Sequence, residues 1–316
     1  MEFAKILFNQ VLIMFLLLAV GYLLFKIRFI TADAANQITK IVLHVVTPAL
    51  ILNTYQMDYD PALAWNMLLG FGLSAGALGI AILISNLARI KSGSTLCIER
   101  FAIVFSNCGF MAVPLVNALF GEVGVFYCNT YITVYNILVW TYGVALMTDG
   151  AAKNETGNSS HRVTSLFKRF LTPTMICIVL GLICYFFQIK FPAPVKTTVE
   201  YIASMNTPLA MLVSGMYLAQ NNLFDALKKF RTYYVVLLKC FVVPLVVLAV
   251  FCFLPLDDTL FTTILIASAC PSASNSLLFA ALYGQDIKTA SNAFTLTTLF
   301  SIISIPLIIL IKGMLG

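Results

Sequence analysis

The chain has 316 residues, of which 60% are hydrophobic and 10% are charged, and its mean hydropathy is +0.95. A soluble domain carries about 25% charged residues, so this composition excludes an ordinary soluble protein and predicts a polytopic membrane protein. The net charge of +6 is typical of cytoplasmic loops and does not indicate nucleic-acid binding. The eight cysteines show no CxxC spacing, so we expect neither a disulfide framework nor a metal site.

Apolar stretches recur along the whole chain, and a membrane span needs about 20 mostly apolar residues. On this criterion we expect an all-α fold of ten transmembrane helices, near residues 5–25, 32–55, 62–88, 98–120, 124–147, 170–189, 196–219, 232–254, 260–283 and 289–313. The one long polar connection, 148–169, divides the chain into a first half (1–147) and a second half (170–316).

The basic residues predict how the chain is oriented. With ten spans, 15 of the 19 Lys and Arg residues fall on one side and four on the other. Cytoplasmic loops carry the excess of basic residues. We therefore expect the 148–169 loop to be cytoplasmic and both termini to lie outside.

The two halves resemble each other in sequence. Similar residues recur at a nearly constant separation of 160 to 163 positions: Thr47-Pro48 with Thr207-Pro208, Gly21 with Gly181, "LFGEVG" (119–124) with "LYGQDI" (282–287), and Asn129 with Asn292. A half with five spans is odd-numbered, so the second half must be inverted relative to the first. Inverted repeats of this kind are typical of transporters and predict a binding site near the midplane.

Two corresponding spans contain residues that interrupt a helix. Span 4 includes "SNCGFMAVP" (106–114), and span 9 includes "ACPSASN" (269–275). Proline removes a backbone donor, and irregular backbone at membrane depth is tolerated where it faces protein or a watery cavity. An interrupted helix also exposes an N-terminus that favours anions. We therefore expect a midplane site for a carboxylate.

The expected site takes its main residues from the two broken spans, and its walls from spans 2 and 5. The main residues are Asn107, Gly109, Phe110, Pro114, Pro271, Ser272, Ser274 and Asn275. The wall positions are Pro48, Asn53, Asn129 and Tyr131.

These motifs resemble the auxin efflux carrier family. "SNCGFMAVPLVNALFG" is similar to the family's Asn-x-Gly-Phe-x-x-x-Pro-Leu segment, which includes Phe110, and "ACPSASNSLLFAALYGQD" is similar to its second broken span. The resemblance implies the fold of bile acid symporters and sodium/proton antiporters, in which spans 4 and 9 cross at their broken centres. It also implies organic anion substrates, such as auxin in plants and dicarboxylates in bacteria. The short central loop differs from plant members and favours a prokaryotic inner-membrane protein.

Charged residues inside the spans bear on how transport is driven. None of the 13 acidic residues falls at the centre of a span, which argues against a carboxylate proton relay. Lys40, His44 and Lys239 do enter spans 2 and 8. Each lysine either has a function or extends along the helix to the headgroups, and His44 is either a proton-coupling group or a hydrogen-bonded packing residue.

The sequence therefore predicts an efflux carrier of small organic anions that works by alternating access. Cation-coupled anion uptake is the alternative, and a channel or receptor on the same fold is a more remote one. No enzyme motif such as HExxH or GxSxG occurs, so we expect no catalysis and no cofactor. The expected partners are the anion, the lipid bilayer and a second copy of the chain in a homodimer.

Overall fold

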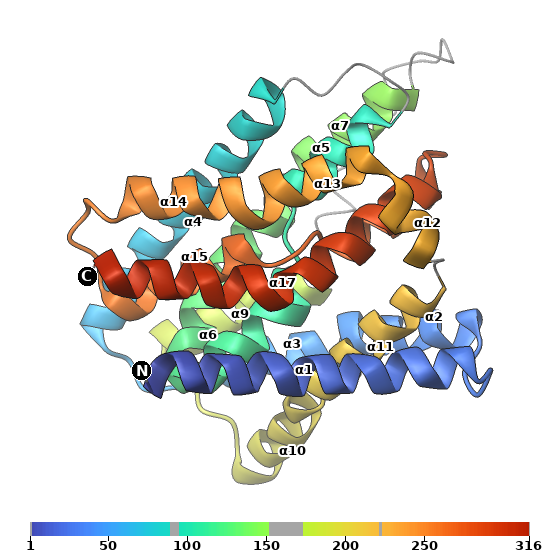
Figure 1. Ribbon diagram of the computed structural model, residues 1–316. Helices are drawn as coiled ribbons and strands as arrows, with labels where there is room; N and C mark the ends of the chain where they lie inside the picture. Colours follow the sequence, from blue (N-terminus) through green and yellow to red (C-terminus); the bar gives the residue numbers. More distant parts are fainter. Residues whose placement is uncertain (1, 89–94, 152–172, 221–222, 316) are drawn as a thin grey trace, which may run out of the picture.

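The computed structural model describes residues 2–88, 95–151, 173–220 and 223–315, and the regular structure of these residues is helical (Figure 1). The only β-type pairing in the described residues is one isolated bridge between Ser106 and Ser272. The α-helices are α1 (Glu2–Lys26), α2 (Ala32–Ile41), α3 (Thr47–Thr54), α4 (Pro61–Leu87), α5 (Leu96–Val104), α6 (Val113–Leu138), α7 (Val144–Ala151), α9 (Pro173–Phe186), α10 (Ala193–Ser204), α11 (Asn206–Ala219), α12 (Leu223–Lys228), α13 (Phe230–Leu237), α14 (Val243–Phe251), α15 (Asp258–Ala269), α16 (Asn275–Leu282) and α17 (Ile287–Leu315).

Seven helical stretches in the described residues are long and apolar enough to cross a membrane, which confirms a polytopic membrane protein. They are Phe8–Lys26, Ala32–Thr54, Pro61–Leu87, Cys108–Thr148, Ala193–Ala219, Phe230–Phe251 and Ile287–Leu315. Two shorter apolar helices, α9 and α15, lie in the predicted spans 6 and 9. Most of the predicted 148–169 loop lies outside the described residues, although α7 continues to Ala151.

The stretch Cys108–Thr148 joins the second half of predicted span 4 to predicted span 5. At 41 residues, it would be about 60 Å long as a straight helix, twice the thickness of the hydrocarbon core. It is not straight, because Gly121 has φ 59° and ψ −144°, a conformation open to glycine and strained for other residues. The turn between the two predicted spans is therefore this glycine kink.

Three prolines lie within helical segments and do not interrupt them. Pro48, Pro114 and Pro244 each lie at the second position of an α-helix that follows a five-residue π-helical turn. These turns are Val42–Val46, Cys108–Ala112 and Leu238–Val242. A π-helical turn widens the helix, which relieves the clash of the proline ring with the preceding turn. The break in span 4 therefore lies before Pro114, at residues 105–107.

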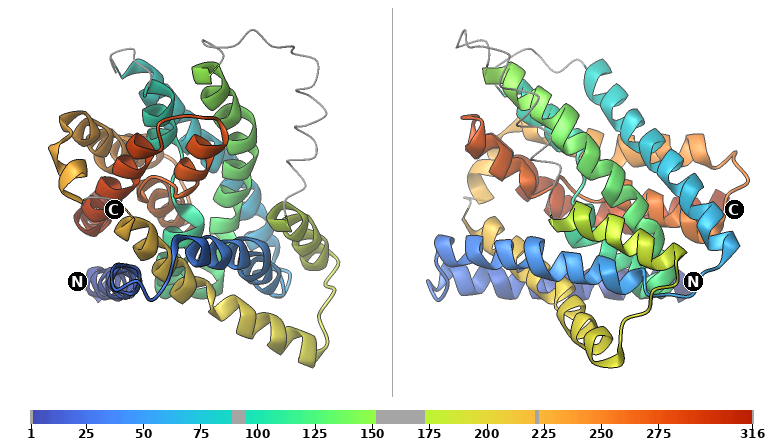
Figure 2. Two further views of the ribbon diagram at one scale, coloured as in Figure 1. Left: turned by 90° about the vertical axis from the view of Figure 1, so that its right-hand side faces the viewer. Right: turned by 180° about the vertical axis from the view of Figure 1, so that it is seen from behind.

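Close contacts between glycines and neighbouring helices hold the bundle together. Helix α1 runs along α11, and Gly21 lies against the backbone of Leu212 while Gly215 lies against Leu18. Helix α9 packs on α3 in a similar way, with Gly181 against the Tyr55 ring. Small residues allow such close approach of membrane helices. Helix α10 stands out from the bundle (Figure 2).

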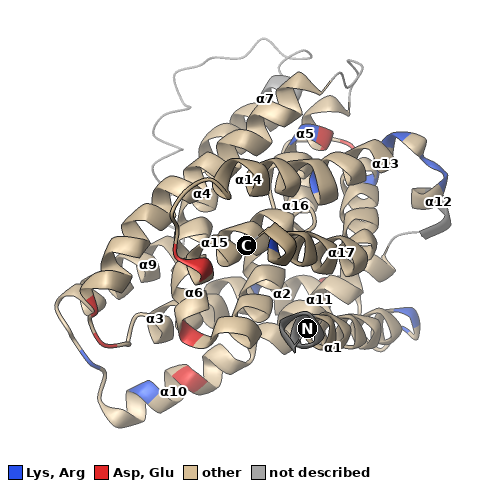
Figure 3. Ribbon diagram, turned by 60° about the vertical axis from the view of Figure 1, so that its left-hand side comes forward, with Lys and Arg blue, Asp and Glu red and all other residues tan. Residues whose placement is uncertain are grey.

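The two ends of the bundle differ in charge. Both termini lie at the same end (Figure 1). Several acidic residues lie towards this end, whereas Lys26 in the last turn of α1 and the basic residues of α12 and α13 lie at the opposite end (Figure 3). Ion pairs such as Lys196–Glu200 and Arg231–Glu99 place both signs of charge at each end, so the difference is one of excess.

Candidate functional site

The two broken spans meet at their breaks. Helix α5 ends at Val104 and α15 ends at Ala269, and the segments that follow run antiparallel to each other. The Asn107 N–H donates to the Pro271 carbonyl (2.8 Å), and the Ala273 N–H donates to the Phe105 carbonyl (2.9 Å). Unwound backbone at membrane depth needs internal partners, and here each break supplies them to the other.

The crossing brings four helix ends together. Helices α5 and α15 end at the breaks, while α16 and the π-helical turn that leads into α6 begin there. Helix N-termini carry positive and C-termini negative partial charge. The crossing therefore has two ends that attract anions and two that attract cations.

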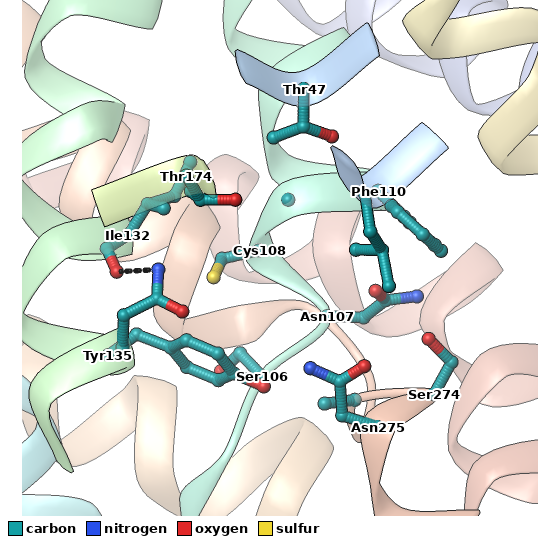
Figure 4. A pocket seen from close by; sticks show the side chains of 14 residues that line it. Thr47, Ser106, Asn107, Cys108, Phe110, Ile132, Tyr135, Thr174, Ser274 and Asn275 are labelled. Atoms are coloured by element: carbon teal, nitrogen blue, oxygen red, sulfur yellow. Dashed lines mark hydrogen bonds between the residues drawn. The ribbon is translucent and has the colours of Figure 1, made fainter. Parts of the chain in front are cut away.

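A cavity of about 70 Å³ lies at the two N-termini (Figure 4). It is lined by Leu43, Thr47, Ser106, Asn107, Cys108, Gly109, Phe110, Ile132, Tyr135, Asn136, Thr174, Ala273, Ser274 and Asn275. This lining includes no acidic or basic side chain. The cavity combines neutral hydrogen-bonding groups with the positive ends of two helices, an arrangement that favours a carboxylate.

Asn107 is the most informative side chain of the cavity. It is 5% exposed, and its Nδ2 atom is buried without a hydrogen-bond partner. Figure 4 shows its amide beside Ser274 and the Asn275 amide. By contrast, the Asn136 Nδ2 already donates to the Ile132 carbonyl (2.8 Å). Because an unpaired buried donor costs about 1–3 kcal/mol, Asn107 is well placed to bind an acceptor that enters the cavity.

The structure brings only some of the predicted site residues to this cavity. Five of them line it: Asn107, Gly109, Phe110, Ser274 and Asn275. Five others are buried around the crossing or in neighbouring helices without lining it: Pro114, Pro271, Ser272, Asn129 and Tyr131. Pro48 is buried in α3, one residue after the lining residue Thr47.

Asn53 lies in a different cavity, of about 250 Å³, together with Asn117, Glu122 and Glu200. The two cavities are separated along α3, because Thr47 lines the first and Leu50 lines the second. A hydrogen bond from the Thr47 hydroxyl to Asn206 Oδ1 (3.4 Å) lies at this boundary.

Several polar lining residues fall outside the predicted set, namely Thr47, Ser106, Tyr135 and Asn136. Ser106 and Thr47 each stand next to a predicted residue in the chain. Tyr135 lies one helical turn after the predicted Tyr131, so the two share a face of α6. The signal for this face of α6 in the sequence is a pair of polar side chains, Tyr131 and Tyr135, one turn apart in an otherwise apolar helix.

The basic residues inside the spans occupy different environments. Lys40 and His44 are exposed on the outer face of predicted span 2, and the His44 ring nitrogen is 2.9 Å from the Lys40 carbonyl oxygen. Neither residue lines the cavity. Lys239 is fully buried, and its Nζ donates to Ser106 Oγ (2.6 Å).

Comparison with known proteins identifies the family to which this chain belongs. The family model described as "membrane transport protein" matches residues 6–309, nearly the whole chain. The chain belongs to this membrane transport protein family, which is the auxin efflux carrier family expected from the sequence.

Two relatives of this membrane transport protein are archaeal. An uncharacterized transporter of Methanocaldococcus jannaschii is 24% identical over 318 aligned residues, which cover 95% of this chain and 96% of the relative. An uncharacterized transporter of Methanothermobacter thermautotrophicus is 22% identical over 307 aligned residues, again covering 95% and 96%. The membrane transport protein is thus a multi-pass transporter, similar to these proteins from end to end.

Proposed function

We propose that the protein is a secondary carrier of small organic anions, with its binding site in the cavity at the crossing of the two broken spans. The observation that carries the proposal is the unpartnered Asn107 amide between two helix N-termini, in a cavity without charged side chains. A carboxylate would accept from this amide and from free N–H groups at the helix ends. The site needs no cofactor for this role.

The two cavities support alternating access. Thr47 lines the first cavity, and its hydrogen-bond partner Asn206 lines the second. The cavity at the crossing, at about 70 Å³, has room for a few water molecules. A carboxylate of several carbon atoms therefore enters it only if the surrounding helices separate. Movement of α3 and α11 relative to the crossing would open one cavity while closing the other.

The membrane potential is the simplest driving force for this carrier. A potential that is negative inside pushes a monoanion outward with about 2.3 kcal/mol per 100 mV. We therefore propose efflux. Cation-coupled uptake remains the alternative, in which sodium binds hydroxyl and carbonyl oxygens at the crossing or His44 carries a proton.

Proteoliposomes that contain the purified protein test the transport proposal. We expect flux of a carboxylate such as malonate to follow an imposed potential, without dependence on sodium or a pH gradient. Asn107→Ala should weaken binding by about 1–3 kcal/mol, because it removes the unpaired donor, whereas Asn136→Ala should cost less, since that amide already donates to Ile132. Electrically silent or sodium-dependent flux would contradict the uniport mechanism, and unchanged affinity of a folded Asn107→Ala protein would contradict the site.

We further propose that the chain crosses the inner membrane ten times as two inverted five-helix repeats. Both termini lie at one end, as an even number of crossings requires. The glycine contacts are reciprocal: Gly21 of span 1 packs on span 7, and Gly181 of span 6 packs on span 2. A two-fold axis that exchanges the halves converts one contact into the other.

A second pair of glycines supports the same repeat. Gly121 and Gly284, which are 163 positions apart, both have positive φ angles, of 59° and 63°. Each follows the second half of a broken span. Matching conformations that only glycine adopts readily are expected if the two halves share one fold.

Cysteine-accessibility labelling tests the orientation. In a cysteine-free background, a cysteine at position 158 in the central loop should react only after the membrane is permeabilised, and one at position 58 should react in intact cells. The basic end of the bundle is the cytoplasmic one in this proposal. The reverse labelling pattern would overturn it.

A further inference from the structure

Lys239 is the one basic residue that is buried in the described part of the chain. It lies in the π-helical turn Leu238–Val242, between α13 and α14, and its side chain is 0% exposed. A lysine near the end of a span usually extends to the interface. Lys239 instead points into the protein, where its amine is held against the crossing.

The amine of Lys239 bonds to both broken spans. It donates to Ser106 Oγ (2.6 Å), just after α5, and to the Ser268 carbonyl (3.4 Å), in the last turn of α15. Ser106 Oγ is itself 3.3 Å from the Ser268 carbonyl oxygen and 3.4 Å from the Tyr131 hydroxyl. The amine therefore lies at the C-terminal ends of two half-helices, where negative partial charge favours a cation.

No carboxylate lies within ion-pair distance of Lys239 in the described part of the chain. The titratable side chains near the Lys239 amine are the thiols of Cys108, Cys240 and Cys270, and a thiol carries no charge. A buried ammonium needs a compensating charge as well as hydrogen bonds. The helix C-termini supply only partial negative charge, so a protonated Lys239 without a bound anion would leave the crossing with a net positive charge.

The Lys239 amine lies directly behind the wall of the candidate anion site. Ser106 accepts the hydrogen bond from Lys239 and also lines the cavity. The ammonium is thus one hydroxyl group away from the space beside Asn107. An anion in the cavity would supply the charge that the protein itself does not.

We propose that Lys239 is the resident counter-cation of the anion site. Its ammonium binds the Ser106 hydroxyl and the Ser268 carbonyl oxygen at the crossing. A dissociable cation such as sodium would otherwise bind these oxygens. Anion binding therefore requires no sodium. This inference rests on the proposed anion site, and the experiments below separate the two.

Anion binding tests the role of the charge. Malonate affinity of the purified wild-type protein should be equal in sodium chloride and choline chloride. Lys239→Met, which keeps the length of the side chain and removes its charge, should lower the affinity at least about tenfold, the ratio given by 1.4 kcal/mol. Lys26→Met, at the exposed end of α1, is the matched control and should bind as the wild type does. A sodium requirement in the wild type, or wild-type affinity in folded Lys239→Met, overturns the proposal.

A measurement without substrate tests the cation position itself. Lys239→Ala leaves a space beside Ser106 and Ser268 that sodium or ethylammonium can fill and choline cannot. We expect either small cation to raise the melting temperature of Lys239→Ala, relative to choline, by more than it raises that of the wild type. Equal responses of the two proteins overturn the proposal. If the wild type binds no carboxylate, the proposed substrate class fails, and this measurement still decides the role of Lys239.

Discussion

Gly215→Ala is expected to destabilise the protein by about 3 kcal/mol, the upper end of the usual cost of overpacking. A Cβ atom at this position of α11 would overlap the Leu18 carbonyl oxygen of α1 and lie 2.8 Å from the Tyr22 nitrogen. Both are backbone atoms, so no side-chain rotation relieves the clash, and α1 must move away from α11. Unfolding of the purified protein in mixed detergent micelles measures the change.

Gly72→Ala is the matched control for Gly215→Ala. Gly72 also lies within a membrane helix, α4, but a Cβ atom there meets nothing within 4 Å. Because alanine favours helix more than glycine does by about 1 kcal/mol, this variant should be unchanged or slightly stabilised. Equal destabilisation by both substitutions would show that helix propensity, and not the approach of α1 to α11, sets the effect.

Arg231→Leu is expected to destabilise the protein by about 2–3 kcal/mol. Arg231 Nε on α13 is 2.5 Å from Oε1 of Glu99, which lies in the first turn of α5. The Glu99 side chain is only 4% exposed. Breaking a buried pair costs about 3–5 kcal/mol because the remaining charge is left without compensation. The expected loss is smaller here because the Arg231 side chain is 41% exposed. The same unfolding measurement applies.

A double-mutant cycle separates the ion pair from general packing. Arg231→Leu should cost much less when Glu99 is already glutamine, since no buried charge is then left behind. Lys196→Met, which breaks the exposed pair of Lys196 and Glu200 (3.8 Å), should change stability by less than about 1 kcal/mol. Additive effects of Arg231→Leu and Glu99→Gln would contradict the assigned role of the pair.

Much of the candidate site was predictable because membrane burial makes polar and helix-breaking residues conspicuous. The Ser106–Pro114 and Ala269–Asn275 segments interrupt otherwise apolar spans, and backbone at that depth must face protein or water. This reasoning identified both breaks, together with Asn107, Gly109, Phe110, Ser274 and Asn275 of the cavity. It did not predict that the break in span 4 is confined to residues 105–107, because a π-helical turn accommodates Pro114 within a helix.

By itself, the sequence determined that the protein is a polytopic transporter of a known family, with two interrupted apolar stretches. Only the tertiary structure decided which face of each helix is buried. Lys40 and Lys239 look alike in the sequence, since each lies in an apolar stretch, yet one is exposed and the other is enclosed against Ser106. In helices that are apolar all round, periodicity does not distinguish the lipid face from the protein face. The contacts between helices make that distinction, and they place Lys239 behind the cavity.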